Sequence, residues 1–146
     1  MRFLNDTDYD VLIRDEIMQL ITELDGTPAN NTKILQAEDM AIAQIKNYLS
    51  GRYDIDKIFS PTPADERNQH IIMITIDMAL YHLYTALSPD KIPEHRSNRY
   101  QDALNWLEKV ATGKIFADLP KLTDDKGNEK YPFIIKSEHT KENHRW

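Results

Sequence analysis

The chain has 146 residues, the size of a single domain, and contains no cysteine, which excludes disulfides, thiolate zinc sites and cysteine nucleophiles. Its net charge is −6; residues 1–25 hold seven acids against two bases, and no segment is the basic patch that phosphate binding requires, so we expect no tight DNA binding. The first residues lack the apolar run of a signal peptide, and we expect synthesis in the cytosol.

Seven prolines divide the chain into four segments with helical periodicity and a tail, which predicts an all-α fold. The first helix is expected to begin after Thr7, which forms a capping-box-like pair with Asp10, and to end before Gly26. Its buried face would consist of Ile13, Ile17, Leu20, Ile21 and Leu24. The second helix is expected at about residues 32–50, with Gly51 as its C-cap and with a buried face of Ile34, Ala37, Ala41, Ile45, Tyr48 and Leu49.

The third helix is expected to be the centre of the fold. Residues 62–65 form a strong helix start, and the helix would run to about Leu87. Of the 17 residues 71–87, 13 are apolar, but this stretch is short for a bilayer and holds Asp77 and His82, which favours a buried helix over a membrane span. A helix that is apolar nearly all round must be covered by other helices or by a neighbouring subunit.

The fourth helix has the clearest helical pattern and is expected at about residues 93–112, with Gly113 as its C-cap. Its buried face would consist of Tyr100, Ala103, Leu104, Leu107, Val110 and Ala111. After Pro120 the sequence becomes polar, with a turn at Gly127 that allows a weak hairpin. We therefore divide the chain into a four-helix bundle-like domain, residues 1–119, and an irregular C-terminal arm, residues 120–146.

Asp77 is the one acid in the apolar part of the third helix, and a buried carboxylate requires hydrogen-bond donors. Tyr81 and Tyr84 lie close to it along the helix, and Arg52 or Arg99 could reach it from neighbouring helices with charge-assisted bonds. These five residues predict a structural polar network rather than general acid–base catalysis.

No pattern in the sequence predicts a catalytic residue, a cofactor or a metal. The five histidines lack zinc-ligand spacing, and glycine-rich nucleotide loops are absent. Two apolar features are instead candidate subunit contacts. Trp106 lies one residue off the core face of the fourth helix, and the arm has one apolar cluster, which consists of Tyr131, Phe133, Ile134 and Ile135.

Three motifs follow one another after the acidic first segment. Residues 48–53 read Tyr-Leu-Ser-Gly-Arg-Tyr, residues 76–84 combine one Asp with two Tyr, and residues 99–115 begin Arg-Tyr-Gln-Asp-Ala-Leu-Asn-Trp-Leu and end Gly-Lys-Ile. In this order the motifs resemble those of the small α-helical head–tail connector, or head-completion, proteins of tailed phages and Mu-like prophages. The resemblance covers about residues 7–119 and does not include the arm.

The resemblance implies a structural subunit of the virion, at the head–tail interface, without enzymatic activity or a cofactor. Such proteins form a ring, commonly of twelve copies, which stacks on the portal protein, contacts tail-side connector proteins and forms a channel for DNA. A net charge of −6 fits a conduit that must not hold its DNA, and it also fits ordinary solubility charge.

Two other functions are compatible with the residues. A small helical nucleic-acid-binding regulator would need a recognition helix, and only the start of the fourth helix offers one, with Arg96, Asn98, Arg99 and Gln101. A small enzyme would need His82, Asp77 and Tyr81 to converge in an open pocket.

Overall fold

The computed structural model describes residues 2–12, 32–60, 66–87 and 89–130. Within these ranges the chain is all-α, as predicted. The elements are α1 (Asp6–Leu12), α3 (Thr32–Leu49), α4 (Ile55–Phe59), α5 (Gln69–Leu87), the short 3-10 helix η2 (Pro89–Lys91) and α6 (Glu94–Ala111). None of these helices combines the length and the apolar character that crossing a bilayer requires.

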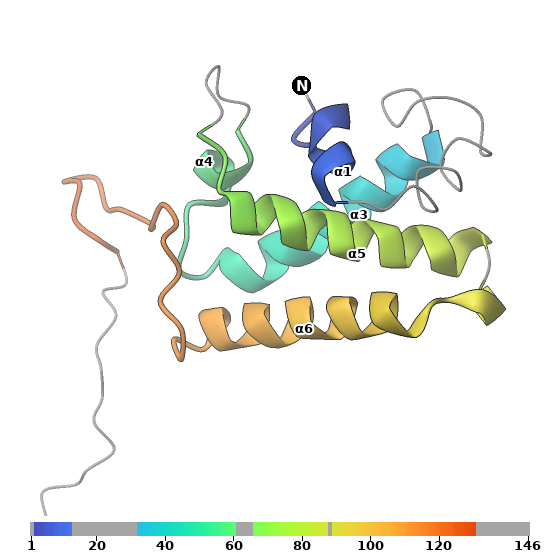
Figure 1. Cartoon of the computed structure of the whole chain (residues 1–146). Coiled ribbons are helices and arrows are strands. Elements are labelled where there is room, and N and C mark those ends of the chain that lie inside the picture. Colours follow the sequence, from blue (N-terminus) through green and yellow to red (C-terminus); the bar gives the residue numbers. More distant parts are fainter. Residues whose placement is uncertain (1, 13–31, 61–65, 88, 131–146) are drawn as a thin grey trace, which may run out of the picture.

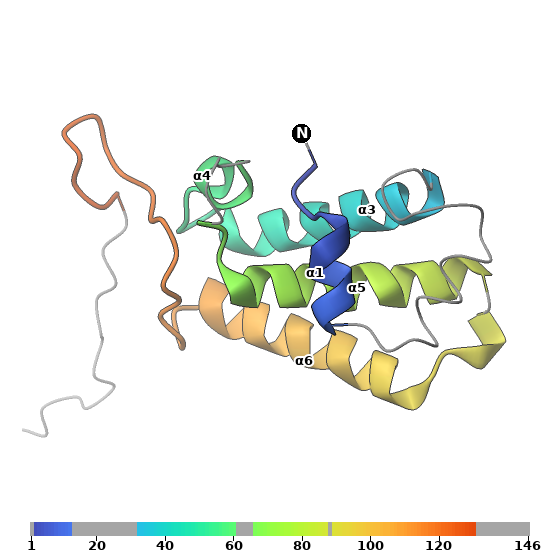
Figure 2. The same cartoon turned by 45° about the horizontal axis from the view of Figure 1, so that its top comes forward.

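Three long helices form the body of the protein (Figure 1). Helix α5 packs against both α3 and α6, which also contact each other, and the short α1 lies across α5 (Figure 2). Every residue of α5 from 71 to 80 except Met73 is buried, including Ile71, Ile72, Ile74, Ile76 and Met78. The expectation that this helix is central is therefore confirmed, and burial of its apolar side chains by two long neighbours is the main stabilising contribution to the fold.

The N-termini of α1 and α5 differ from the predicted ones because an asparagine side chain caps each of these helices. The side-chain Oδ1 of Asn68 accepts hydrogen bonds from the backbone N–H groups of His70 and Ile71, so α5 begins at Gln69 and residues 66–68 are not helical. In α1, Asn5 and Asp8 cap each other reciprocally, so Asn5 caps this helix in place of the predicted Thr7. Residues 13–31 and 61–65, with the rest of the predicted first helix and the predicted start of the third, lie outside the described residues.

The predictions for α3 and α6 are confirmed to within one residue at each end. Gly113 has a φ of +79° after α6, as a C-cap glycine should, whereas Gly51 after α3 is not in the left-handed region. Helix α4 was not predicted; it is a single turn whose N-cap, Asp54, accepts a hydrogen bond in its side chain from the backbone N–H of Lys57.

The first residues of the arm pair with the segment that follows α3. The backbone N–H of Asp54 donates to the carbonyl of Pro120 at 2.8 Å, and the N–H of Leu122 donates to the carbonyl of Arg52 at 3.2 Å. The chain then turns at Gly127, where φ is +81°, in the expected hairpin. In Figures 1 and 2 this hairpin stands off from the end of the three-helix body. The domain boundary at residue 119 remains a prediction.

Candidate functional site

Asp77 connects the central helix to α6. Its side chain is buried, and its Oδ1 atom accepts hydrogen bonds from Arg99 Nε at 2.8 Å and from Arg96 Nη1 at 3.2 Å. The hydrogen bond to Asp77 raises the pKa of Arg99, so the guanidinium is held in its charged form. Two cations one turn apart on α6 thus neutralise one buried acid on α5, which fixes the contact between the two helices.

Only part of the predicted polar network is assembled around Asp77. Among the described residues its donors are Arg96 and Arg99; Tyr81, Tyr84 and Arg52 contribute no hydrogen bond to it. The ring of Tyr81 instead stacks on Tyr100 of α6, with centroids 4.0 Å apart.

Arg52 lies at the other end of α6, with its guanidinium directly over Gly113. A Cβ atom at position 113 would come within 2.8 Å of Arg52 Nη1. Glycine is therefore favoured at this position both by the positive φ and by the close approach of Arg52. Arg96 was not among the predicted members of the network around Asp77. Arg96 precedes Arg99 by three residues, so both lie on one face of the helix. This spacing would have predicted Arg96 as a second donor to Asp77.

A second polar cluster joins all three long helices. His82 Nε2 of α5 lies 2.5 Å from Gln44 Oε1 of α3, and Gln44 Nε2 donates to the hydroxyl of Tyr100 at 3.1 Å. Burial lowers the pKa of His82, which favours the neutral imidazole. Asp77 and His82 line different hollows of the protein, so the convergence that a small enzyme would need with Tyr81 is not present in this arrangement.

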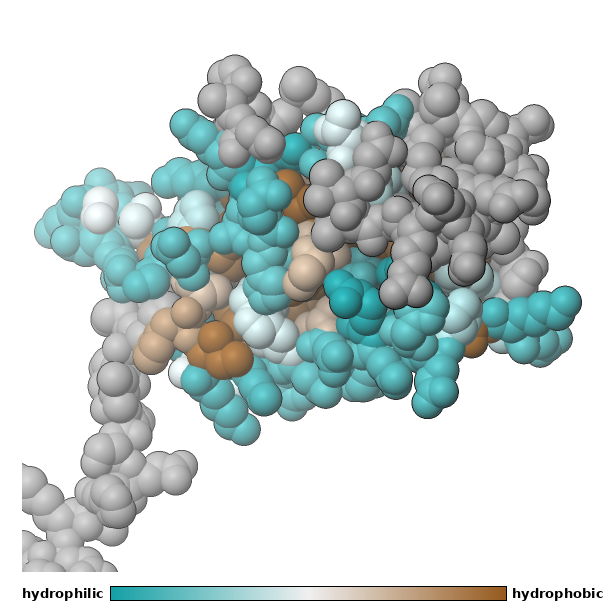
Figure 3. Space-filling model, in the orientation of Figure 1, coloured by the Kyte–Doolittle hydropathy of each residue, from teal (hydrophilic) through white to brown (hydrophobic). Residues whose placement is uncertain are grey.

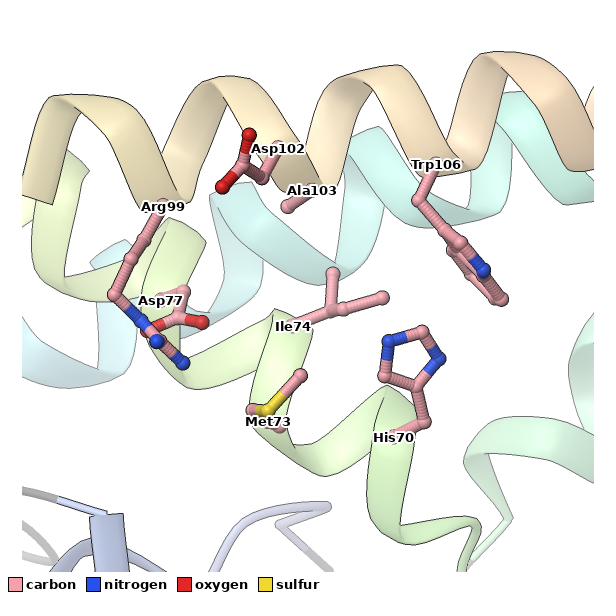
Figure 4. A pocket seen from close by; sticks show the side chains of 8 residues that line it. All are labelled: His70, Met73, Ile74, Asp77, Arg99, Asp102, Ala103 and Trp106. Atoms are coloured by element: carbon pink, nitrogen blue, oxygen red, sulfur yellow. The ribbon is translucent and has the colours of Figure 1, made fainter.

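The hollow beside Asp77 is a groove of about 140 Å³ between α5 and α6. Figure 4 shows its two ends: His70 and Trp106 face each other at one end, and Asp77 and Arg99 lie at the other. The His70 and Trp106 rings meet edge to face with centroids 4.4 Å apart. Trp106 is half-buried, and its ring forms a wall of this groove. The groove is therefore the place where this predicted contact residue is accessible.

Tyr131, Phe133, Ile134 and Ile135, the other predicted contact residues, lie outside the described residues. On the described surface, Figure 3 shows apolar residues over the front of the three-helix body and at the base of the arm. Within the described ranges, no group of three or more His, Asp or Glu side chains is placed to hold a metal ion.

A third polar cluster attaches the N-terminal residues to α3, and it was not predicted from the sequence. Glu38 of α3 is 2% exposed and accepts hydrogen bonds from Arg2 and from the hydroxyl of Tyr9, whose pKa is raised by burial and by the Glu38 carboxylate. Next to it, Arg67 donates to Asp8 Oδ2 and to the carbonyl of Phe3, both at 2.7 Å. The sequence signal was an acid on the apolar face of the second helix, between Ala37 and Ala41 on that face.

Comparison with known proteins identifies the family. A family model described as Bacteriophage Mu, Gp36 matches residues 9–134 of the chain. The chain belongs to the Bacteriophage Mu Gp36 family. It is thus a protein of Mu-like phages, as the motif order indicated, and the match includes the arm as far as Ile134, beyond the region of resemblance that we had assigned. Searches of curated proteins and of solved structures gave no match.

Proposed function

We propose that the protein is a structural component of the phage particle, a head–tail connector or head-completion subunit that forms a ring on the portal protein at the capsid vertex. In this position it contributes to the DNA channel and contacts tail-side connector proteins. The observation that supports this function is the match to the Mu Gp36 family over most of the chain, together with the order of the three connector-like motifs within the matched region.

The ionisable residues are consistent with a structural rather than a catalytic role. Asp77 is used to hold α6, Glu38 is used to hold the N-terminal residues, and His82 bonds to Gln44. Each of these groups has a partner that explains its burial. A net charge of −6 also suits a channel through which DNA passes, because few cations are present to displace counterions and retain the nucleic acid.

The alternative, a nucleic-acid-binding regulator, is not favoured by the geometry of α6. Arg96 is 5% exposed, and the exposed Arg99 donates to Asp77, so both cations of the supposed recognition helix are paired with an acid of the protein itself. Base and phosphate contacts require side chains that can reach the DNA grooves. Of the four candidate residues, Asn98 and Gln101 are left on the exposed surface without such an ion pair.

The proposed function is tested by mixing the full chain with its cognate portal and examining the product by electron microscopy. A ring stacked on the portal supports the proposal. A bare portal, combined with binding of the protein to duplex DNA at physiological salt, would instead favour the regulator. A monomer in dilute solution decides nothing, because assembly can require the portal as a template.

A further inference from the structure

The groove between α5 and α6 has the size and polarity of a docking site for a short peptide. Its volume of about 140 Å³ is well below the roughly 300 Å³ at which pockets for whole metabolites or cofactors begin. Met73, Ile74 and Ala103 give it an apolar floor between the Trp106 end and the charged end (Figure 4). Such a groove can accept one or two apolar side chains, with the half-buried ring of Trp106 as an anchor.

The chain itself contains a segment that suits this groove. Residues 131–135 read Tyr-Pro-Phe-Ile-Ile, the only apolar cluster in the arm, and Pro132 disfavours helix and favours an extended backbone. Lys136 follows directly, and the exposed carboxylate of Asp102, whose charge also acts on Arg99, lies at the rim of the groove. An extended segment could therefore place aromatic and aliphatic side chains in the groove and a lysine near a carboxylate.

The position at which the described chain ends indicates which copy receives the segment. The arm leaves the body at the C-terminal end of α6, turns at Gly127 and reaches Lys130 in a hairpin that stands off from the helices (Figures 1 and 2). The described chain thus ends away from the body with sixteen residues still to follow, which favours an adjacent subunit as their partner. The family match includes this segment as far as Ile134.

We infer that residues 131–135 of one copy dock in the α5–α6 groove of the neighbouring copy. The donor segment and the acceptor groove are different surfaces, so the contact is head-to-tail, and such contacts close into rings when the rotation between subunits permits. The inference rests on the proposed ring and specifies how its subunits are joined. It assigns one interface to both sets of predicted contact residues, Trp106 and the apolar cluster of the arm.

Cross-linking tests this contact directly because the chain has no natural cysteine. A tagged Phe133→Cys chain is mixed at high concentration with a Met73→Cys chain and treated with a short bis-maleimide. The matched control replaces Met73→Cys with Met40→Cys, since Met40 is a 56% exposed methionine on α3 beside the other hollow. We expect heterodimers to form about tenfold faster with Met73→Cys, which corresponds to a docking preference of about 1.4 kcal/mol. Equal rates, or no heterodimer, would overturn the inference.

The double variant Met73→Cys/Phe133→Cys distinguishes the neighbouring copy from the same copy. Linked oligomers that increase with protein concentration are expected. A product that stays monomeric at every concentration would show that the segment docks on its own groove, which contradicts the contact between copies.

Adding Trp106→Ala should reduce the rate with Met73→Cys to that of the Met40→Cys control, after circular dichroism has shown that the helices are retained. An unchanged rate would exclude Trp106 as the anchor. These measurements use no portal, so they are independent of the test of function. If the protein forms rings on the portal but no cross-link forms between positions 73 and 133, only the docking is rejected. If the cross-link forms but the protein does not bind the portal, the connector function is rejected.

Discussion

Two buried carboxylates hold the protein together, and their surroundings differ. Glu38 is enclosed: its partners are Arg2, whose side chain is 21% exposed, and the fully buried Tyr9. Asp77 is also buried, and so is its partner Arg96, but its second partner, Arg99, has a side chain that is 45% exposed and lies in the wall of a groove. The same chemical requirement, neutralising one buried acid, is met by a closed cluster on one side of the body and by an open one on the other.

The two clusters, the closed one around Glu38 and the open one around Asp77, serve different purposes. The closed cluster attaches the N-terminal residues to α3, and a charge buried there has no route to water if its partner is lost. The open cluster attaches α6 while leaving Arg99 at the surface, at the end of the groove opposite Trp106, where a second chain could add contacts. We therefore expect substitutions in the closed cluster to affect mainly stability, and substitutions around the open cluster to affect both stability and assembly.

Glu38→Ala should have the largest effect. Removing the carboxylate leaves the buried hydroxyl of Tyr9 without its acceptor and leaves Arg2 with Asp6 alone, which should lower the free energy of unfolding by about 3 kcal/mol. Urea denaturation followed by circular dichroism measures this loss. The control Glu38→Gln keeps an acceptor oxygen and should lose less. Wild-type stability of Glu38→Ala would show that the closed cluster does not hold the N-terminal residues.

Asp77→Ala should cost less, about 2 kcal/mol, because the exposed Arg99 can turn to water and only the buried Arg96 loses an acceptor that water does not replace. The same denaturation experiment gives the value, with Asp77→Asn as the control that keeps an acceptor. A loss larger than that of Glu38→Ala would reverse the comparison. An unchanged melting curve would mean that the ion pairs contribute nothing to the packing of α6.

Truncation measures how much the start of the arm contributes to the stability of the helical body. A chain that ends at Leu119 loses the backbone hydrogen bonds from Asp54 to Pro120 and from Leu122 to Arg52, at about 1 kcal/mol each, whereas a chain that ends at Lys130 keeps both. Both chains should retain their helical circular dichroism, and only the shorter one should be measurably less stable. Loss of the helical signal at Leu119 would place the arm within the core.

The smallest effect concerns pH. Burial lowers the pKa of His82 below its usual 6.5, so the unfolded chain binds a proton more readily than the folded one, and stability should fall as the pH decreases below about 6.5. His70 is shifted in the same direction by burial and should add to the slope. Melting temperatures between pH 7.5 and pH 5.5, a range of about two units around the His value, should decrease less in His82→Gln. An equal decrease in the variant would exclude His82 as the source.

The helical architecture was predictable because its signals are local. Apolar spacing located α3 and α6 to within one residue, since both helices have one buried and one exposed face. The start of α5 was predicted too early because a strong Thr-Pro start at residues 62–63 outweighed the weaker cap at Asn68. Helix α4 is a single turn, too short to show any periodicity.

The site was less predictable because it depends on pairings between helices. Asp77 could be identified as an acid that needs donors, and Arg99 was among the candidates, but no local rule places Arg52 over Gly113 or Tyr81 on Tyr100. Glu38 was not predicted to be buried because a single acid at the edge of an apolar helix face can also extend its carboxylate into solvent. Its burial depends on Arg2 and Tyr9, which lie 29 to 36 residues away in the sequence.

The central claim is that the protein joins phage heads to tails, and a phage that lacks it tests this claim most directly. Lysates of the null mutant, examined by electron microscopy, should contain heads and free tails that are not joined, and supplying the protein from a plasmid should restore complete virions. Complete virions in the null mutant, or the absence of assembled heads, would contradict the account.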